Sequence, residues 1–414
     1  MLHGLLGCLA ILGIAFACSE NRRNIPWRTV TAGVALQWAL ALLLTRFAPA
    51  QALILLLNDA ATALQNATDQ GTGLVFGYLG GGTLPFVETH PGASFILAFK
   101  ALPLVLVISA LASVLFYWGV LQRVTAAFAW LLRRGMGIGG ALALGAAVHV
   151  FVGMIEAPLL VRPYLARMQR GELFALMTCG MAGVAGTVMV IYAAFLAPII
   201  PNALGNILTA SVISTPAGLA IAALMVPFLA KPADEARITL ADPPSGTLDA
   251  VVRGTLDGIP ILAGIVATLL VTVALVALLN RGLGLLPAWD GAAITLQRLF
   301  ALPFRPLMWA IGIPWDQSAA AAALMGSKTV LNEFVAYLGL AGLPDGALSP
   351  HSRLIVTYAL CGFANFGSLG ILIGGLGAMV PQRRAEIVDL GLRSILSGTL
   401  ATCMSGAVIG AISG

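Results

Sequence analysis

The sequence has 414 residues, of which 59% are hydrophobic and only 9% carry a charge. Its mean hydropathy is +0.96. These values exclude an ordinary water-soluble domain and indicate an all-α, polytopic membrane protein whose main solvent is the lipid bilayer. The net charge of +5 does not indicate nucleic-acid binding, because the arginines fall in short loops between apolar segments, where they act as orientation signals.

The chain begins with an apolar segment, residues 2–18, that we interpret as a transmembrane helix. A cleaved signal peptide carries basic residues before its apolar core, whereas Arg22 and Arg23 follow this one. Residues 29–47 and 95–121 also provide the roughly 20 apolar residues that a helix needs to cross the hydrocarbon layer. The mixed stretch between them contains the sequence GYLGGGTLPF, and we expect it to be interfacial or re-entrant.

Two segments in the middle of the chain have other patterns. Residues 122–134 space their apolar side chains with a helical period, which predicts a helix lying flat on a membrane face or, alternatively, a solvated connector. Residues 137–168 are interrupted by Gly153, Glu156 and Pro158. A spanning helix would not tolerate this break unless neighbouring protein satisfied the freed backbone groups. The pattern therefore predicts a helical hairpin that dips into the membrane.

The second half of the chain has a similar organisation. A polar loop is expected at residues 231–258, and residues 294–344 form a second interrupted apolar region. The remaining predicted spans are residues 172–197, 207–228, 259–279, 353–380 and 387–412. Together these patterns predict about eight transmembrane helices and two re-entrant hairpins.

Basic residues favour one orientation of these segments. If the spans alternate and the N-terminus lies outside, 14 of the 22 Lys and Arg residues fall on cytoplasmic faces, as the positive-inside rule requires. These residues are Arg22, Arg23, Arg28, Arg123, Arg133, Arg134, Arg162, Arg167, Arg170, Lys231, Arg237, Arg253, Arg383 and Arg384. We therefore expect a multi-pass protein of the bacterial inner membrane whose two termini are periplasmic.

Two short motifs repeat each other. CGMAGVAG begins at Cys179 and CGFANFGS begins at Cys361, and each follows an interrupted region that contains a glutamate, Glu156 or Glu333. The arginines of residues 162–170 assign the first hairpin to the cytoplasmic face, whereas the second is entered from the opposite face. This order predicts an inverted-topology repeat, in which discontinuous helices converge on a binding site at the midplane. The expected divisions are N-terminal scaffold helices and interfacial helices (1–135), a first repeat (136–230), a cytoplasmic loop and scaffold helix (231–293) and a second repeat (294–414).

The intramembrane carboxylates are the strongest candidates for a binding site. Burying a charge in hydrocarbon costs on the order of 3 kcal/mol or more, so Glu156 and Glu333 are expected to face a cavity, together with Asn365 and Ser368. A carboxylate accepts paired hydroxyl groups well, which suits a sugar. Two structural alternatives stay open. Glu333 could pair with Lys328, although a spacing of five does not place them on one helical face, and Glu156 could be an unligated hairpin cap.

The strings GSKTVLNEFVAY, GMIEAPLL and CGFANFGS resemble the concentrative nucleoside transporter family, and the likeness covers nearly the whole chain. The resemblance implies a homotrimer whose scaffold helices hold a mobile transport domain that carries the substrate across as an elevator. It also implies that Glu333, Asn365 and Ser368 hold the ribose of a nucleoside. Phe363 would lie near the sugar, and Glu156 near the base. The expected substrate site is completed by Gly153, Met154, Ile155 and Asn332.

The chain departs from the family pattern at two places. Met154 and Ile155 stand where many members have a polar pair that hydrogen-bonds the base edge, so base recognition is expected to depend on shape and apolar contact. At the family's sodium site, His149 replaces an asparagine and Gly183 replaces a hydroxyl residue. Imidazole nitrogen and a missing hydroxyl suit sodium poorly, because sodium prefers hard oxygen ligands. The residues expected at the coupling site are His149, Val152, Gly183 and Val184.

These departures favour proton coupling over sodium coupling, which remains the alternative. Histidine titrates near physiological pH, so His149 could carry the coupling proton; otherwise it fills the site structurally and a glutamate carries the proton. No other cofactor is expected. An intramembrane enzyme is disfavoured because the four histidines form no H-E-x-x-H pair, and the five cysteines show no metal-site spacing. Hairpins that occlude the substrate fit alternating access better than a passive channel.

Overall fold

The computed structural model describes residues 2–88, 94–229, 244–289 and 291–414. Within these ranges the protein is helical, with one isolated bridge between Trp289 and Ala292 and no strand. The all-helical architecture predicted from the sequence is therefore confirmed. Lys231 and Arg237 of the predicted polar loop lie outside the described residues.

In the described part of the chain, six helical segments are long and apolar enough to cross a membrane. They are Trp27–Arg46, Leu97–Tyr117, Arg170–Leu196, Ala203–Met225, Thr247–Leu283 and Pro381–Ser413. Two further apolar helices, His3–Ala17 and Phe366–Met379, are shorter. The polytopic membrane class follows from these lengths, because about 20 apolar residues in a helix span the hydrocarbon layer.

The N-terminal helices include one that the sequence did not predict. α1 (Leu2–Ala17) and α2 (Trp27–Arg46) occupy two of the expected spans. α3 (Ala48–Phe76) is a continuous helix of 29 residues, where an interfacial or re-entrant stretch was expected. Polar residues lower its hydropathy, but the segment is rich in Ala, Leu and Gln, which are good helix formers. Only the Gly-rich end, which includes η1 (Gly77–Gly80), departs from the α-helix.

The next helices lead to the first hairpin. α6 is the helix expected at residues 122–134, and it lies between Gly119 and Gly137, which both have positive φ and end it on either side. The first hairpin is broken at residues 149–155, which include Gly153 of the predicted interruption, whereas Glu156 and Pro158 belong to the next helix. The bounds are α4 (Leu97–Lys100), α5 (Leu104–Tyr117), α6 (Val120–Met136), α7 (Gly140–Val148), α8 (Glu156–Leu160) and α9 (Arg162–Leu165).

The remaining elements show the same order twice, a hairpin followed by a broken helix and a long helix. In the first half α10 (Arg170–Ala182), α11 (Gly186–Leu196) and α12 (Ala203–Met225) follow the hairpin. The second hairpin is formed by α15 (Trp315–Val330) and α16 (Glu333–Ala341), and it is followed by α17 (Pro350–Leu360), α18 (Phe366–Met379) and α19. The other bounds are α13 (Thr247–Leu283), α14 (Leu296–Ala310), η2 (Pro381–Arg383) and α19 (Arg384–Ser413).

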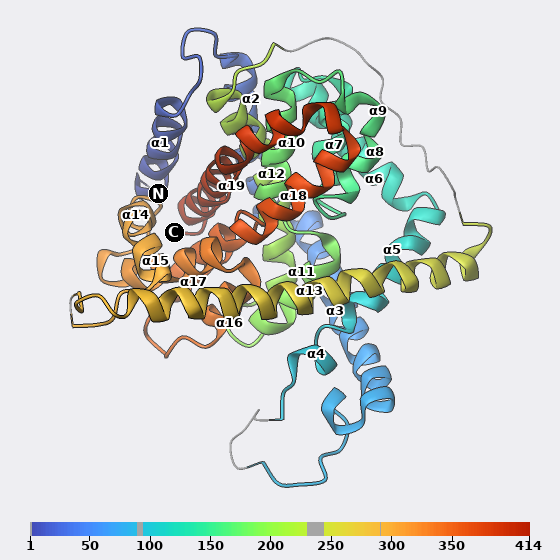
Figure 1. Ribbon diagram of the computed structural model, residues 1–414. Helices are drawn as coiled ribbons and strands as arrows, with labels where there is room; N and C mark the ends of the chain where they lie inside the picture. Colours follow the sequence, from blue (N-terminus) through green and yellow to red (C-terminus); the bar gives the residue numbers. More distant parts are fainter. Residues whose placement is uncertain (1, 89–93, 230–243, 290) are drawn as a thin grey trace.

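Figure 1 shows how these elements are arranged. α12 and α19 lie at the centre and pack against α10, while α8 and α9 lie at one end of the molecule and α16 lies at the other. α13 is a single helix of 37 residues that crosses one side of the molecule and packs chiefly against α5. Gly254 and Gly258 permit this approach, because a Cβ at Gly254 would lie 2.6 Å from the Ser109 carbonyl oxygen.

The two helix breaks cross each other. The Phe363 N–H, between α17 and α18, donates to the carbonyl of Gly183, between α10 and α11, at 3.2 Å. Beside this bond the chains are so close that a Cβ at Gly362 would lie 2.7 Å from the Met181 oxygen. Unwound backbone needs such partners, because groups freed from a helix cannot be left unpaired in hydrocarbon.

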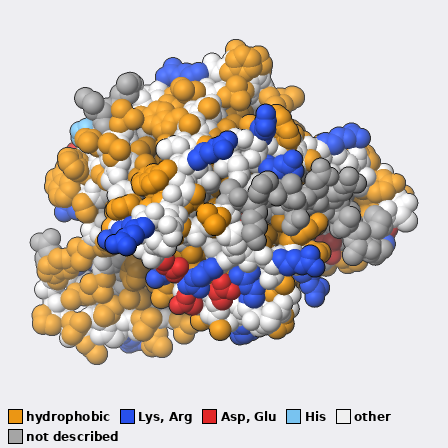
Figure 2. Space-filling model, turned by 90° about the horizontal axis from the view of Figure 1, so that it is seen from above, with side chains coloured by type: hydrophobic (Ala, Val, Ile, Leu, Met, Phe, Trp, Pro, Cys, Tyr) orange, Lys and Arg blue, Asp and Glu red, His pale blue; other side chains and the backbone are white. Residues whose placement is uncertain are grey.

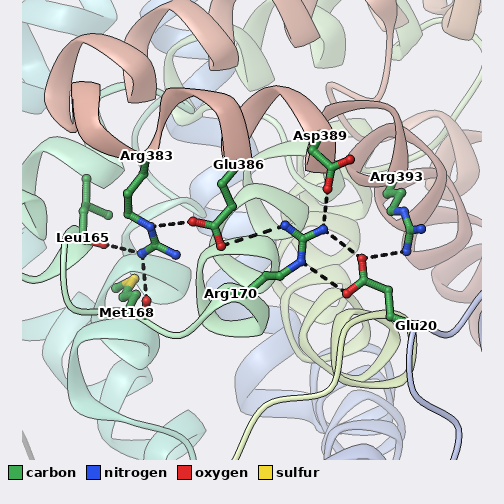
Figure 3. A network of polar contacts seen from close by, with 8 residues as sticks. All are labelled: Glu20, Leu165, Met168, Arg170, Arg383, Glu386, Asp389 and Arg393. Atoms are coloured by element: carbon green, nitrogen blue, oxygen red, sulfur yellow. Dashed lines mark hydrogen bonds and ion pairs between the residues drawn. The ribbon is translucent and has the colours of Figure 1, made fainter.

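Charged side chains collect at one end of the molecule. Figure 2 shows Lys and Arg side chains spread over the face that is uppermost in Figure 1, with a smaller acidic group among them. Part of this face is an ion-pair network (Figure 3) in which Arg170 contacts Glu20 at 2.9 Å and Asp389 at 2.5 Å. The network joins the α1–α2 loop to the starts of α10 and α19, which an alternating topology places on one side of the membrane.

Arg383 fixes the end of the first hairpin within the same region. Its Nη1 donates to the carbonyls of Leu165 and Met168, each at 2.7 Å, and its Nε donates to Glu386 at 2.8 Å. One side chain thus satisfies two backbone acceptors at the end of α9, where a helix leaves carbonyls without partners.

Candidate substrate chamber

A cavity of about 1000 Å³ lies between the hairpins on one side and α5 and α13 on the other. This volume is at the upper end of the range of small-molecule sites. All nine residues that the sequence predicted for the substrate site line it, together with Val152. The nine residues are Gly153, Met154, Ile155, Glu156, Asn332, Glu333, Phe363, Asn365 and Ser368.

Glu333 is the most enclosed carboxylate of the chamber, with 4% of its surface exposed. It is the first residue of α16, and the preceding Asn332 caps that helix by accepting the Val335 N–H at 3.0 Å. The position suits an anion, because the free N–H groups and the dipole of a helix N-terminus stabilise negative charge. Glu333 Oε1 accepts a hydrogen bond from the Tyr192 hydroxyl at 2.6 Å, and Oε2 accepts one from Asn365 Nδ2 at 3.1 Å.

Asn365 joins the Glu333 carboxylate to the break between α17 and α18. Its Oδ1 accepts the Ser368 N–H at 2.7 Å and so caps α18, which leaves Nδ2 for Glu333. The amide orientation follows from these partners, because only the oxygen can accept from an N–H and only the nitrogen can donate to a carboxylate. Glu333, Asn365 and Ser368 thus form one connected polar wall.

Glu156 lies on another part of the chamber wall, at the first residue of α8. Its carboxylate folds back over the hairpin tip, since a Cβ at Gly153 would lie 2.2 Å from Oε2. The side chain is exposed to the cavity rather than buried in protein. The tip is otherwise apolar, with Met154 and Ile155 beside the carboxylate.

His149, Gly183 and Val184 do not line the chamber but lie behind it. His149 is 5% exposed, and its Nδ1 lies 2.6 Å from the Gly145 carbonyl oxygen. A carbonyl can only accept, so Nδ1 carries the proton and Nε2 of the neutral ring keeps its lone pair. Among the described residues Nε2 has no hydrogen-bond partner, and it faces α10, where a Cβ at Gly180 would lie 3.2 Å from it.

Ser211 of α12 is a residue of this region that the sequence did not indicate. Its Oγ is buried without a partner in the described part of the chain and lies 3.2 Å from the place where a Cβ of residue 183 would stand. The carbonyl oxygens of Cys179 and His149 lie 3.8 and 4.0 Å from the same point. A hydroxyl therefore does stand beside Gly183, although it comes from another helix.

Tyr192 of α11 was also not predicted, because nothing in the sequence distinguishes it from an ordinary aromatic residue in an apolar helix.

Lys328 is held by hydrogen bonds to other helices. Its Nζ donates to the Ala359 carbonyl at 2.9 Å and to Thr402 Oγ1 at 3.1 Å. The hydrogen bonds of Lys328 thus go to α17 and α19, whereas the alternative interpretation expected Lys328 to pair with Glu333.

The helical architecture and a chamber with a polar wall between broken helices are those of a multi-pass transporter. Three family models match: "Na+ dependent nucleoside transporter N-terminus" at residues 6–79, "Nucleoside recognition" at residues 98–199 and "Na+ dependent nucleoside transporter C-terminus" at residues 206–410. Among curated proteins, an uncharacterized transporter of Haemophilus influenzae is 38% identical over 99% of this chain and 97% of its own length. The chain belongs to the concentrative nucleoside transporter family.

Other relatives and solved structures agree with this assignment. Sodium/nucleoside cotransporter 1 of Mus musculus is 31% identical over 98% of this chain, which spans 62% of the mouse protein. The structure of CNTnw in an inward-facing substrate-bound state has a TM-score of 0.87 and 34% identity, and covers 99% of this chain and 97% of its own. A CNTnw variant in an outward-facing state has a TM-score of 0.88, with 34% identity over 100% and 98%. The family and these relatives are transporters and not enzymes.

Proposed function

We propose that this protein imports nucleosides across the bacterial inner membrane by cation symport. The observation that carries the proposal is the wall formed by Glu333, Asn365 and Ser368 inside a cavity large enough for a nucleoside. Each Glu333 oxygen already accepts one hydrogen bond, and a carboxylate oxygen has capacity for another. The two vicinal hydroxyls of a ribose can supply them, and Phe363 lines the same cavity.

The base is proposed to lie at the first hairpin. Met154, Ile155 and Val188 line this part of the chamber, and they offer shape and apolar contact rather than hydrogen bonds. Glu156 is then the polar group nearest the base, where it can accept an N–H from a base edge. Discrimination among bases by apolar contact is modest, so we expect both purine and pyrimidine nucleosides to be carried.

The transport cycle is proposed to be an elevator movement in a homotrimer built on inverted repeats. Each hairpin packs against the broken helices, α7 against α10 and α16 against α11 and α17, whereas α5 and α13 form the opposite wall of the chamber. We propose the division into residues 1–135, 136–230, 231–293 and 294–414 as the parts of this movement. The chamber extends to Arg253 and Asp257 at the start of α13, on the face expected to be cytoplasmic, which supports an inward-open arrangement.

The coupling ion is proposed to be the proton, with His149 as its carrier. His149 Nε2 is a buried atom without a partner in the ranges that the structure describes, and its lone pair can accept a proton while Nδ1 remains bound to Gly145. Val152, on the same hairpin tip, lines the chamber, and Gly183 bonds to Phe363. These links connect the surroundings of the histidine to the proposed sugar site.

Sodium is the second candidate. Sodium/nucleoside cotransporter 1 is among the relatives. In addition, Ser211 places a hydroxyl beside Gly183, where the family pattern has a hydroxyl side chain that this sequence lacks. Together with the carbonyl oxygens of His149 and Cys179 this makes a set of oxygen donors, the ligand type that sodium prefers.

The experiment that separates these proposals is uptake of labelled uridine and adenosine into proteoliposomes, with proton and sodium gradients imposed separately. Accumulation driven by the proton gradient alone supports proton coupling. Uptake that depends on sodium and ignores the pH gradient contradicts it and supports the second candidate. In counterflow, nucleoside preloaded inside the vesicles accelerates the entry of labelled nucleoside. Absence of counterflow would contradict the proposal that the protein is a carrier.

A further inference from the structure

Tyr192 is a buried tyrosine that binds the carboxylate proposed to hold the ribose. It is 2% exposed, and its hydroxyl donates a hydrogen bond to Glu333 Oε1, with 2.6 Å between the two oxygens. Tyr192 belongs to α11 in the first half of the chain, whereas Glu333 and Asn365 belong to the second half. The two carboxylate oxygens are therefore held by donors from different halves, one oxygen each.

The Tyr192 ring has little freedom to move. Its centroid lies 5.8 Å from that of Phe334 in an edge-to-face contact and 5.1 Å from that of Tyr337. Such aromatic pairs are favourable beyond their burial. The hydroxyl is consequently presented to Glu333 by a ring that is fixed on two sides.

Two fixed donors determine the rotation of the carboxylate about its terminal bond. With Oε1 bound by Tyr192 and Oε2 bound by Asn365, the plane of the group is set before any ligand arrives, and the unused lone pairs are directed by the same plane. A carboxylate with only one donor can turn. It would then accept one hydroxyl as readily as two.

We propose that Tyr192 is a positioning residue for sugar recognition: it orients Glu333 so that the carboxylate accepts the two vicinal hydroxyls of a ribose together. The proposal rests on the proposed function of the chamber. It predicts that the Tyr192 hydroxyl contributes to the preference for ribonucleosides over 3′-deoxynucleosides without itself being required for a folded protein.

The test compares uridine and 3′-deoxyuridine binding to the full-length protein in detergent, by calorimetric titration of the native chain and of Tyr192→Phe. The native protein is expected to prefer uridine, and Tyr192→Phe to reduce the ratio of the two Kd values by about tenfold, which corresponds to about 1.4 kcal/mol. Tyr192→Phe keeps both ring contacts, so its unfolding temperature, measured in parallel, is expected to stay close to that of the native protein.

Tyr337→Phe is the matched control. Tyr337 is also fully buried, packs on the Tyr192 ring and donates its hydroxyl to the Thr357 carbonyl at 2.9 Å instead of to Glu333. Its ratio of Kd values is expected to equal the native ratio. An unchanged ratio in Tyr192→Phe, or an equal loss in Tyr337→Phe, overturns the proposal. If the native protein binds neither nucleoside, the proposed function fails instead.

Discussion

Asn365 contacts Glu333 through its amide nitrogen at 3.1 Å while its amide oxygen holds the first turn of α18. The same side chain therefore ends a helix break and presents a donor to a buried carboxylate. A structural role and the proposed binding role coincide in one residue, and mutations have to be designed so that the two effects can be separated.

Replacing Asn365 by alanine removes both bonds. We expect helix stability to fall by about 1 kcal/mol from loss of the cap, and uridine affinity to fall by roughly tenfold or more, because a hydrogen bond to a charged group contributes about 1.5–3 kcal/mol. Thermal unfolding and calorimetric titration measure the two effects. Ser349→Ala is the control, since Ser349 caps α17 by accepting the Ser352 N–H at 3.1 Å and lies outside the chamber lining. Equal affinity losses in both variants would contradict a binding role for Asn365.

Glu333→Gln tests the charge of the proposed ribose site. The amide keeps the shape of the side chain but offers only one acceptor oxygen and places N–H donors beside Tyr192 or Asn365. We expect uridine affinity to fall by about 10- to 100-fold. Glu156→Gln, at the proposed base site, is expected to leave the ratio of affinities for uridine and 2′,3′-dideoxyuridine unchanged. Loss of that ratio in Glu156→Gln, with retention in Glu333→Gln, would reverse the two assignments.

The double substitution His149→Asn with Gly183→Ser tests the assignment of the coupling ion. It adds two oxygen-bearing side chains, and a serine at residue 183 would place its Cβ 3.2 Å from Ser211 Oγ. We expect uridine uptake to become responsive to a sodium gradient, because hard oxygen ligands replace an imidazole nitrogen. Proteoliposome uptake under separate sodium and proton gradients is the measurement. A variant that still follows only the proton gradient would show that His149 is not the determinant of coupling.

Arg383→Met tests the attachment of the first hairpin to α19. The substitution keeps an apolar stem but removes the donors to Leu165 and Met168 and the ion pair to Glu386. Leaving partly buried carbonyls without donors costs about 1–3 kcal/mol, so we expect a lower temperature of thermal unfolding. Arg384→Met, at an exposed neighbouring position, is expected to leave that temperature unchanged. A drop of the same size in both variants would indicate a general charge effect.

Much of the architecture could be predicted because the bilayer restricts what the chain can do. Gly153, Glu156 and Pro158 interrupt an apolar run, and such a break is tolerated only where protein surrounds it, so the first hairpin was found at its actual position. α3 was not predicted, because its polar residues give it the mean hydropathy of an interfacial stretch. Its helical structure is instead favoured by the helix propensity of its residues.

The site could be predicted in its polar residues but not in their partners. Glu333 and Asn365 stand out in an apolar chain. Tyr192 and Ser211 are common residue types in apolar helices, α11 and α12, that are far from Glu333 in the sequence. Their roles depend on which helix faces which, and this relation is set by tertiary packing that one sequence does not show. His149 illustrates the same limit, because the structure turns it toward Gly180 and away from the cavity.

The bond between the Phe363 N–H and the Gly183 carbonyl joins main-chain atoms. A substitution at residue 183 or 363 keeps both main-chain groups, with the exception of proline at residue 363, which has no N–H to donate. The connection between the pocket around His149 and the proposed sugar wall therefore does not depend on the side chain of Phe363, although it requires the close approach that Gly362 permits. If the proposed roles hold, substitutions around His149 can change the coupling cation while the main-chain bond to the proposed sugar site is kept.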